Sequence, residues 1–249
     1  MSKEALPLPK AHIPGMIPTL NDTGFMTDEP DAYSLEFAAY AGSIRAPTLD
    51  IGCAYGVATI AALAEGATVT ACDMEERHLE ILASRVPEEA RGRLTTAVGV
   101  LPYKDFPEAS FGAVLAARVL HFLTGPAIEE SVSKMAVWLA PEGRLFLITD
   151  TAYAGLWRAY APEYERLKAE GHPWPGEIHD AQRFLPEPAR QRSRVRYMNF
   201  LDPGILRRVC EGAGLVVEKC GWIGPGAHER GKAYGDKERA GVVARKPGK

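Results

Sequence analysis

The chain alternates short apolar runs with amphipathic segments over most of its length. Apolar runs of about four to eight residues are typical of strands buried on both faces, and apolar residues three or four positions apart are typical of helices. The runs predict strands at residues 47–51, 68–73, 93–98, 111–117 and 144–149. The amphipathic segments predict helices at residues 29–41, 55–65, 75–85 and 126–139. Such alternation indicates an α/β fold in which helices cover both faces of a parallel sheet.

The alternation is interrupted in two places. Residues 1–30 are rich in Pro and Gly and have no periodicity, so they predict an irregular arm. Residues 151–198 carry several aromatic residues and prolines, and we expect them to form an inserted cap that binds substrate. A predicted helix at 202–213 and strands at 215–220 and 241–245 then resume the pattern. The expected organisation is an arm and lid helix at 1–45, an α/β domain made of 46–150 and 199–249, and the cap at 151–198.

Composition narrows the function classes. The 249 residues are 46% hydrophobic and 24% charged, as in an ordinary globular protein. The net charge of −3 provides no general attraction to nucleic acid or to an anionic membrane, so we expect neither partner. The four cysteines have no CxxC spacing and predict buried free thiols rather than a metal site. The first residues lack the apolar core of a signal peptide, so a cytoplasmic location is expected.

The most informative segment is TLDIGCAYG at residues 48–56, where a short strand leads into a glycine turn and then a helix. Free N–H groups at such a helix N-terminus favour a carboxylate or a phosphate. A dinucleotide fingerprint needs two further glycines, but Ala54 and Val57 occupy those positions. Asp50 would also lie unfavourably beside a pyrophosphate. It suits a ligand with an amino group beside a carboxylate, such as the methionine end of S-adenosylmethionine.

Three later segments fit the same ligand. Asp73 closes the second predicted strand, where a carboxylate can accept hydrogen bonds from ribose hydroxyls. It could equally cap the helix that follows. Val98–Pro102 offers small and apolar residues to wall an adenine, and Ala116–Phe122 lies at the point where open α/β sheets bind ligands.

In this order, LDIGCAYG, ACD, SFGAVLAARVLHFL, LAPEGRLFLITD and FLDPGILRRVCEGAGLVVEK resemble the class I S-adenosylmethionine-dependent methyltransferases. The resemblance spans about residues 46–150 and 199–245. It implies a doubly wound, mostly parallel seven-stranded sheet, the Rossmann-like methyltransferase fold, whose last strand runs antiparallel. Two departures stand out. Ala54 replaces the middle glycine of the turn, and no acidic residue lies near Ala97 to contact the adenine amino group.

The resemblance and the residues above give a set of expected cofactor contacts. They are Asp50, Gly52, Cys53, Ala54, Gly56, Asp73, Met74, Val100, Leu101, Ala117 and Arg118. His121 follows the fourth predicted strand, where a base could reach a hydroxyl or an amine, and we take it as the candidate catalytic residue. The alternative is that it only packs at the rim of the sheet. Alignment alone can supply most of the rate of a methyl transfer, so no strong base is required.

The acceptor pocket is expected to draw on the arm and the cap. The candidates are Tyr33, Tyr153, Trp157, His172, Trp174 and His179. Tyr33 and Phe37 could form a lid over the cofactor or an apolar stripe that docks their helix. Two histidines and Asp180 near Trp174 also raise the possibility of a metal, but their spacing matches no specific site.

Arg190, Arg192, Arg194 and Arg196 alternate and would share one face of an extended chain. This row could hold an anionic acceptor or RNA, and a solvated edge is the favoured interpretation. The sequence therefore predicts an enzyme that transfers a methyl group to an O or N atom of a small molecule. The alternatives are a cofactor-binding protein without methyl transfer and, less favoured, an RNA methyltransferase.

Overall fold

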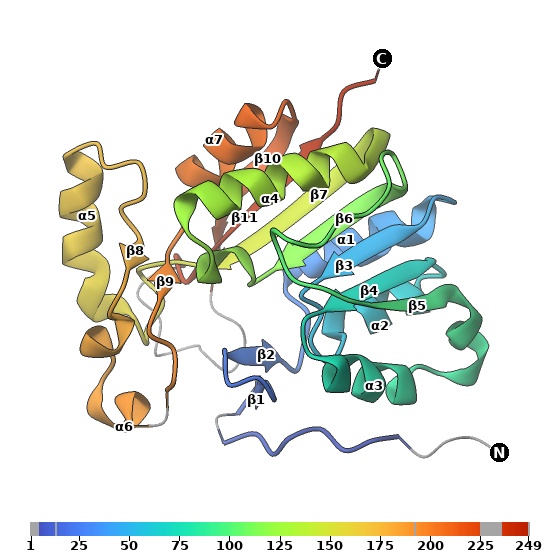
Figure 1. The fold of residues 1–249 in the computed structure, drawn as a ribbon, viewed down its shortest axis with the longest axis horizontal. Coiled ribbons are helices and arrows are strands. Elements are labelled where there is room, and N and C mark those ends of the chain that lie inside the picture. The colour runs from blue at the N-terminus through green and yellow to red at the C-terminus, as the bar shows by residue number, and fades with distance from the viewer. Residues whose placement is uncertain (1–4, 13, 192, 225–235, 249) are drawn as a thin grey trace.

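A seven-stranded sheet forms the centre of the protein (Figure 1). The computed structural model describes residues 5–12, 14–191, 193–224 and 236–248. The strand order across the sheet is β10-β11-β7-β6-β3-β4-β5. The bounds are β3 Thr48–Ile51, β4 Val69–Asp73, β5 Leu94–Val98, β6 Phe111–Ala117, β7 Leu139–Asp150, β10 Val216–Ile223 and β11 Arg239–Arg245.

Strand direction confirms the predicted fold. Strands β5, β4, β3, β6 and β7 are parallel, and β11 runs antiparallel to both β7 and β10. The order reverses between β3 and β4 on one side and β6 on the other, so the carboxyl ends of β3 and β6 flank a crevice. The last strand of the sheet is antiparallel, as the family resemblance implied.

Helices cover both faces of the sheet and bury its apolar side chains (Figure 1). Helices α1 Ala32–Ser43, α2 Val57–Ala64 and α3 Glu76–Arg85 pack on one face, and α4 Gly125–Trp138 and α7 Pro203–Gly212 pack on the other. Short 3-10 helices lie at Glu88–Arg93 and Leu120–Phe122. Each predicted helix is present, with bounds that differ by one to three residues at the caps.

Helix α1 is a docked helix rather than a lid. Asp31 caps it by accepting hydrogen bonds from the backbone N–H groups of Tyr33 and Ser34. Phe37 is fully buried, and its ring meets that of Phe146 on β7 edge to face at 5.6 Å. Tyr33 is buried in the same apolar cluster and adjoins Gly241 of β11. Of the two interpretations of Tyr33 and Phe37, the structure supports the apolar stripe.

The arm contains a hairpin that the sequence did not predict. Strands β1 Met16–Pro18 and β2 Phe25–Thr27 pair antiparallel, and Figure 1 shows them beside the carboxyl ends of β3 and β4. Ile17 and Met26 are buried against Tyr55 and Ile81 of the α/β domain. Because each strand has only three residues, its alternation is too short to register as a periodic pattern.

The cap, residues 151–198, folds around its own apolar cluster. Its elements are η3 Arg158–Tyr160, α5 Ala161–Ala169, β8 Glu177–Ile178, η4 Ala181–Phe184 and α6 Glu187–Arg190, and β8 pairs with β9 Met198–Asn199. Tyr160, Tyr164 and Phe200 are fully buried within this cluster. In Figure 1 the cap stands at the side of the sheet, across from α3.

Strand β7 starts earlier than predicted. The sequence predicts a turn at residues 141–143, but these residues are part of β7. The register slips between Phe111 and Ala113 of β6, and Glu142 has a positive φ of 65°. The strand therefore contains an irregularity where the turn was expected.

Among the described residues, no helix is both long enough and apolar enough to cross a bilayer.

Candidate active site

A cavity of about 1180 Å³ opens at the carboxyl ends of β3, β4, β6 and β7. Four parts of the chain line it: the N-terminal hairpin, the strand ends with their following loops, the cap, and residues 238–239 at the start of β11. This volume exceeds that of most single-ligand sites, which hold about 300–1,000 Å³. The cavity can therefore receive two small molecules side by side.

The glycine turn forms one wall of the cavity. Gly52 has a φ of 76°, and a Cβ atom on it would lie 2.1 Å from Val119 Cγ2, so only glycine fits there. Ala54 also adopts a left-handed backbone, with φ 46°. Gly56 caps α2 in the same conformation but faces Leu82 rather than the cavity. Gly56 therefore shapes the turn and does not line the site.

Asp50 lies at the floor of this turn. It is buried, and its Oδ2 accepts a hydrogen bond of 2.6 Å from the Thr59 hydroxyl on α2. Burial raises the pKa of Asp50 to about 6, against the opposing effect of the Thr59 hydrogen bond. A cation placed beside Asp50 would lower this pKa and offset the cost of burying its charge. The site therefore favours a ligand with a positive group at this point.

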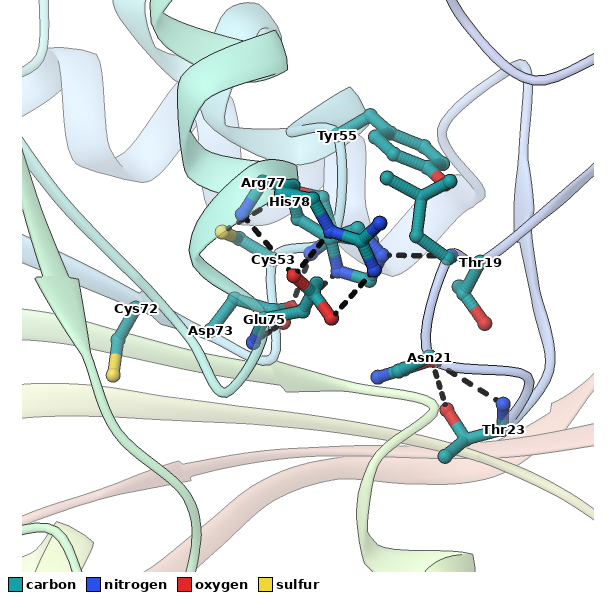
Figure 2. Close-up of polar contacts among 12 residues, drawn as sticks. Thr19, Asn21, Thr23, Cys53, Tyr55, Cys72, Asp73, Glu75, Arg77 and His78 are labelled. Atoms are coloured by element: carbon teal, nitrogen blue, oxygen red, sulfur yellow. Dashed lines mark hydrogen bonds and ion pairs between the residues drawn. The ribbon is translucent and has the colours of Figure 1, made fainter.

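Asp73, at the end of β4, is held by three donors (Figure 2). Its Oδ2 accepts from the Ala54 N–H at 2.8 Å, and its Oδ1 accepts from the Glu75 N–H at 2.9 Å. The third partner is His78 Nδ1, 3.0 Å from Oδ1. A carboxylate has about four lone-pair sites, so Asp73 can accept one more hydrogen bond from a ligand in the cavity.

His78 links Asp73 to the N-terminal hairpin (Figure 2). Its Nε2 accepts a hydrogen bond of 3.0 Å from the Leu20 N–H, so the ring proton lies on Nδ1 and is donated to Asp73. The ring is almost fully buried and meets Tyr55 edge to face. The Tyr55 hydroxyl donates to the Pro18 carbonyl at 2.8 Å, a second tie between the hairpin and the domain.

Small and apolar residues continue the wall beyond Asp73. Met74, Gly99, Val100 and Leu101 line the cavity after β4 and β5, and Met74 and Val100 have exposed side chains. A flat aromatic ring can pack against such a surface. This apolar wall begins at Met74, directly after Asp73 in the sequence.

The ends of β6 and β7 place a buried ion cluster in the middle of the cavity wall. Arg118 Nε lies 3.1 Å from Asp150 Oδ1, and Arg239 Nε lies 3.7 Å from the same oxygen. Burial raises the pKa of Asp150, but Arg118, His121 and Arg239 outweigh this effect and hold it at about 2. Arg118 has a left-handed backbone with φ 60°. Asp150 therefore remains a carboxylate at every physiological pH.

His121 also lines the cavity but is almost fully buried. Its Nδ1 accepts a hydrogen bond of 3.2 Å from the Asp150 N–H and lies 3.3 Å from the Thr149 hydroxyl. The ring proton is therefore on Nε2. Burial, and secondarily the charge of Arg118, lower the pKa of His121 to about 4, against the effect of Asp150. His121 is thus a neutral hydrogen-bond donor at neutral pH and has no free lone pair to act as a base.

The predicted cofactor contacts converge on this cavity. All of them except Gly56 line it: Asp50, Gly52, Cys53, Ala54, Asp73, Met74, Val100, Leu101, Ala117 and Arg118. Among the predicted substrate contacts, only Trp157 does.

The remaining substrate candidates lie elsewhere. Tyr33 points from α1 into the apolar core. The Tyr153 hydroxyl donates a hydrogen bond to Glu165 inside the cap. Trp174 packs against Gly125 at the start of α4, with the Arg208 guanidinium over its ring. His172 accepts from the Trp174 N–H, and His179 is exposed beside Glu177. These five residues do not line this cavity, and their aromatic and polar groups contribute to packing and loop structure.

Three comparisons bear on what the cavity binds. Residues 48–143 match the model of the family described as a methyltransferase domain. This stretch of the chain therefore corresponds to a methyltransferase domain. No curated protein sequence gives a significant match.

Solved methyltransferase structures share the fold. A methyltransferase of Methanosarcina mazei is 15% identical, with a TM-score of 0.61 over 82% of this chain and 93% of that one. The N1-methyltransferase of Burkholderia thailandensis that was solved with 1,6-didemethyltoxoflavin and S-adenosylhomocysteine is 20% identical, with a TM-score of 0.57 over 87% and 79% of the two chains. The glycopeptide N-methyltransferase MtfA with S-adenosylhomocysteine is 19% identical, with a TM-score of 0.59 over 88% and 90%.

The residues of this methyltransferase fit its cofactor. A sulfonium nucleoside carries an amino group, a carboxylate, ribose hydroxyls and an adenine. Asp50 provides a buried carboxyl whose charge a cation would stabilise, and Asp73 retains accepting capacity for hydroxyls. The apolar wall from Met74 to Leu101 offers a surface for the base. Among the residues that the structure describes, no three His, Cys, Asp or Glu side chains come together as metal ligands would.

Sequence reasoning missed several residues of the methyltransferase site. His78 and the hairpin backbone at Leu20 support Asp73, and Arg239 completes the ion cluster around Asp150. His78 lies within an ordinary helix pattern. Arg239 is the first residue of β11 and lies 41 positions after the end of the cap at residue 198. Only the folded sheet brings them to the cavity. The glycine turn and Asp73 belong to local motifs and were recognisable.

Proposed function

We propose that this methyltransferase transfers the methyl group of S-adenosylmethionine to an O or N atom of a small-molecule acceptor. The observation that carries the proposal is one continuous cavity. The glycine turn and Asp73 line one half of it, and the cap lines the other half. A cofactor in the first half and an acceptor in the second would meet beside Arg118 and His121. The N1-methyltransferase solved with 1,6-didemethyltoxoflavin has the same fold and supports an acceptor that is a small molecule.

We assign the cofactor contacts by position. Asp50 attracts the amino group, the N–H groups at the start of α2, where Val57 and Ala58 line the cavity, face the carboxylate, and Asp73 accepts from the ribose hydroxyls. When bound, the cofactor supplies an electrophilic methyl group on a sulfonium. The chain contributes alignment of the two ligands in a cavity that its hairpin and cap shield from water.

His121 is proposed to act as a donor. With its proton on Nε2, it can donate a hydrogen bond to one lone pair of an acceptor oxygen, or to a polar group beside an acceptor nitrogen, and so leave the attacking lone pair free to face the methyl group. Its low pKa keeps it neutral in doing so. The proton released by the acceptor would then leave to solvent, because neither His121 nor Asp150 can accept it at neutral pH.

The decisive experiment combines binding and transfer. Calorimetry should show that both S-adenosylmethionine and S-adenosylhomocysteine bind the wild-type chain. The Asp73→Asn variant should bind each about 1–3 kcal/mol more weakly, since a charge-assisted hydrogen bond to ribose is lost. Asp105→Asn is the matched control, because Asp105 pairs with Lys134 on the surface and lies outside the cavity.

Transfer is measured with methyl-labelled cofactor and a panel of small hydroxyl- and amine-bearing aromatic compounds. Label in an acceptor, lost in Asp73→Asn and retained in Asp105→Asn, is the expected result. Failure of both cofactor forms to bind would refute the cofactor site. Binding without transfer to any acceptor would instead favour a cofactor-binding protein without catalysis.

A further inference from the structure

The cap contributes charge of only one sign to the cavity. Its charged lining residues are Arg158, Arg183 and Arg194, and no acidic cap residue lines the cavity within the described part of the chain. The three arginines come from three separate places: η3, η4 and the segment before β9. They are therefore not a consequence of one basic stretch of sequence.

Two of these arginines have no ion-pair partner among the described residues and can therefore bind a ligand. Within the described residues, no carboxylate lies within ion-pairing distance of Arg158 or Arg183. The Arg183 guanidinium lies 4.6 Å from the centre of the Phe184 ring, which holds it at the cavity wall. Arg194 lies 3.7 Å from Asp22 of the hairpin, and both side chains are exposed.

The arginine row expected from the sequence is divided by the fold. Arg190 pairs with Glu187 on α6, and Arg192 lies outside the described residues. Arg194 lines the cavity, whereas Arg196 does not. The solvated-edge interpretation thus fits Arg190 but not Arg194.

The opposite half of the cavity carries the opposite charge. Asp50 and Asp73 line the cofactor side, and Asp22 and Asp31 line the cavity from the N-terminal arm, with Asp22 lying 3.7 Å from Arg194 of the cap. No arginine or lysine before Arg118 in the sequence lines the cavity among the described residues. Between the halves, the lining residues Arg118, Asp150, Glu238 and Arg239 bring two charges of each sign. The cavity therefore changes from negative at the cofactor end to positive at the cap end. Such a field favours a cation in one half and an anion in the other.

Apolar side chains line the cavity together with the cap arginines. They include Phe122, Leu156, Trp157 and Phe184. Aromatic and aliphatic walls of this kind bind the flat or hydrocarbon body of a ligand, while a few charged groups fix its orientation.

We propose that the acceptor carries an anionic group, a carboxylate or a phosphate, which Arg158 and Arg183 bind while the apolar wall holds its body. This inference rests on the proposed function, because it places the acceptor in the cap half of the same cavity. Guanidinium groups bind both anions through paired hydrogen bonds. Anchored at the cap, the acceptor presents its opposite end to the methyl-transfer position beside His121.

The test uses the complete chain saturated with S-adenosylhomocysteine and three probes of one shape: benzoate, phenyl phosphate and neutral benzamide. At least one anion should bind about tenfold or more tightly than benzamide at low salt, and this preference should shrink as salt is added. The tighter anion identifies the chemistry, carboxylate or phosphate. Arg158→Gln and Arg183→Gln should each weaken anion binding about three- to tenfold and leave benzamide binding unchanged.

Arg196→Gln is the matched control, since Arg196 belongs to the same cap and does not line the cavity. Arg158→Lys with Arg183→Lys keeps the charge and should retain part of the anion preference, which separates charge from a folding defect. Equal binding of benzamide and the anions, no anion binding, or anion binding insensitive to both Gln variants would overturn the proposal.

A short single-stranded RNA that binds more tightly than phenyl phosphate and weakens in the same variants would also overturn it, because the acceptor would then be a polyanion rather than a small molecule. If S-adenosylhomocysteine itself does not bind, the failure belongs to the proposed function and not to the cap arginines.

Discussion

Asp50 illustrates how a single residue in this methyltransferase can be kept for binding at the expense of stability. Its carboxyl is buried and shares the floor of the turn with Asp73, whose charge also raises its pKa. Since the folded pKa of about 6 exceeds the ordinary 3.8, folding favours the protonated form. The resulting loss of stability is absent below about pH 4, grows as the pH rises toward 6, and persists above it.

Asp50→Asn should therefore raise the free energy of unfolding at pH 7, by about 1–3 kcal/mol, and weaken S-adenosylmethionine binding about tenfold or more. Denaturant unfolding at several pH values and calorimetry at pH 7 measure the two effects. The stability gain should disappear near pH 4. An unchanged cofactor affinity would show that the amino group does not lie beside Asp50.

Ala54 is a second residue that departs from local preference. Its φ of 46° lies in the left-handed region, which disfavours alanine by about 1–2 kcal/mol relative to the right-handed helix. Ala54→Gly should relieve this strain, and the added freedom of the unfolded chain offsets about 0.4–1 kcal/mol of the gain. We expect a net stabilisation of about 0.5–1 kcal/mol, seen as a rise of about 1–4 °C in Tm by calorimetry. A lower Tm would contradict the strain interpretation.

At the scale of elements, the N-terminal hairpin acts on the cofactor site through His78. His78→Phe removes both the Leu20 and the Asp73 hydrogen bonds, and we expect it to weaken S-adenosylhomocysteine binding by about 1–2 kcal/mol. His78→Asn, which can still donate to Asp73, should restore part of the affinity. Calorimetry measures each constant.

Tyr55→Phe is the control for this effect. It loosens the hairpin by removing the hydrogen bond to Pro18 but leaves the donors of Asp73 in place. If His78→Phe and Tyr55→Phe weaken binding equally, His78 acts only by holding the hairpin. A larger effect of His78→Phe, abolished when the ligand lacks ribose hydroxyls, would show that it positions Asp73.

Helix α1 provides a contrasting case. Because Phe37 is buried against Phe146, Phe37→Ala should destabilise the protein by about 3–5 kcal/mol. Cofactor affinity, measured at a temperature where the variant is folded, should be unchanged. A selective loss of affinity with little loss of stability would instead restore the lid interpretation.

How far the sequence predicts these elements depends on how local their causes are. Strand β6 has the predicted bounds, and the glycine turn with Asp73 is placed correctly, because apolar runs and turn residues act over a few neighbours. The N-terminal hairpin and the cap residues that reach the cavity depend on contacts between distant segments. Tyr153, His172, Trp174 and His179 have the composition of a binding site but are positioned by packing inside or behind the cap.

At the scale of the whole molecule, hairpin, sheet and cap enclose one cavity, so a ligand there contacts all three. S-adenosylhomocysteine at about 100 times its Kd should stabilise the folded state by about 2.7 kcal/mol. For a chain of 249 residues this corresponds to a rise of roughly 5–11 °C in Tm. Thermal unfolding with and without the ligand measures it, and an unchanged Tm would show that the cavity does not bind this molecule.

The ion cluster around Asp150 has a consequence for how the acceptor can be recognised. Arg118 and Arg239 keep Asp150 ionised, and His121 stays neutral above about pH 4. Between about pH 7 and 9, neither side chain changes its protonation. With saturating cofactor, a bend in the rate curve across that interval that shifts when the acceptor is changed then belongs to the molecule being methylated. A simple titration of turnover would thus report whether that molecule reacts through an amine, a phenol or an alcohol.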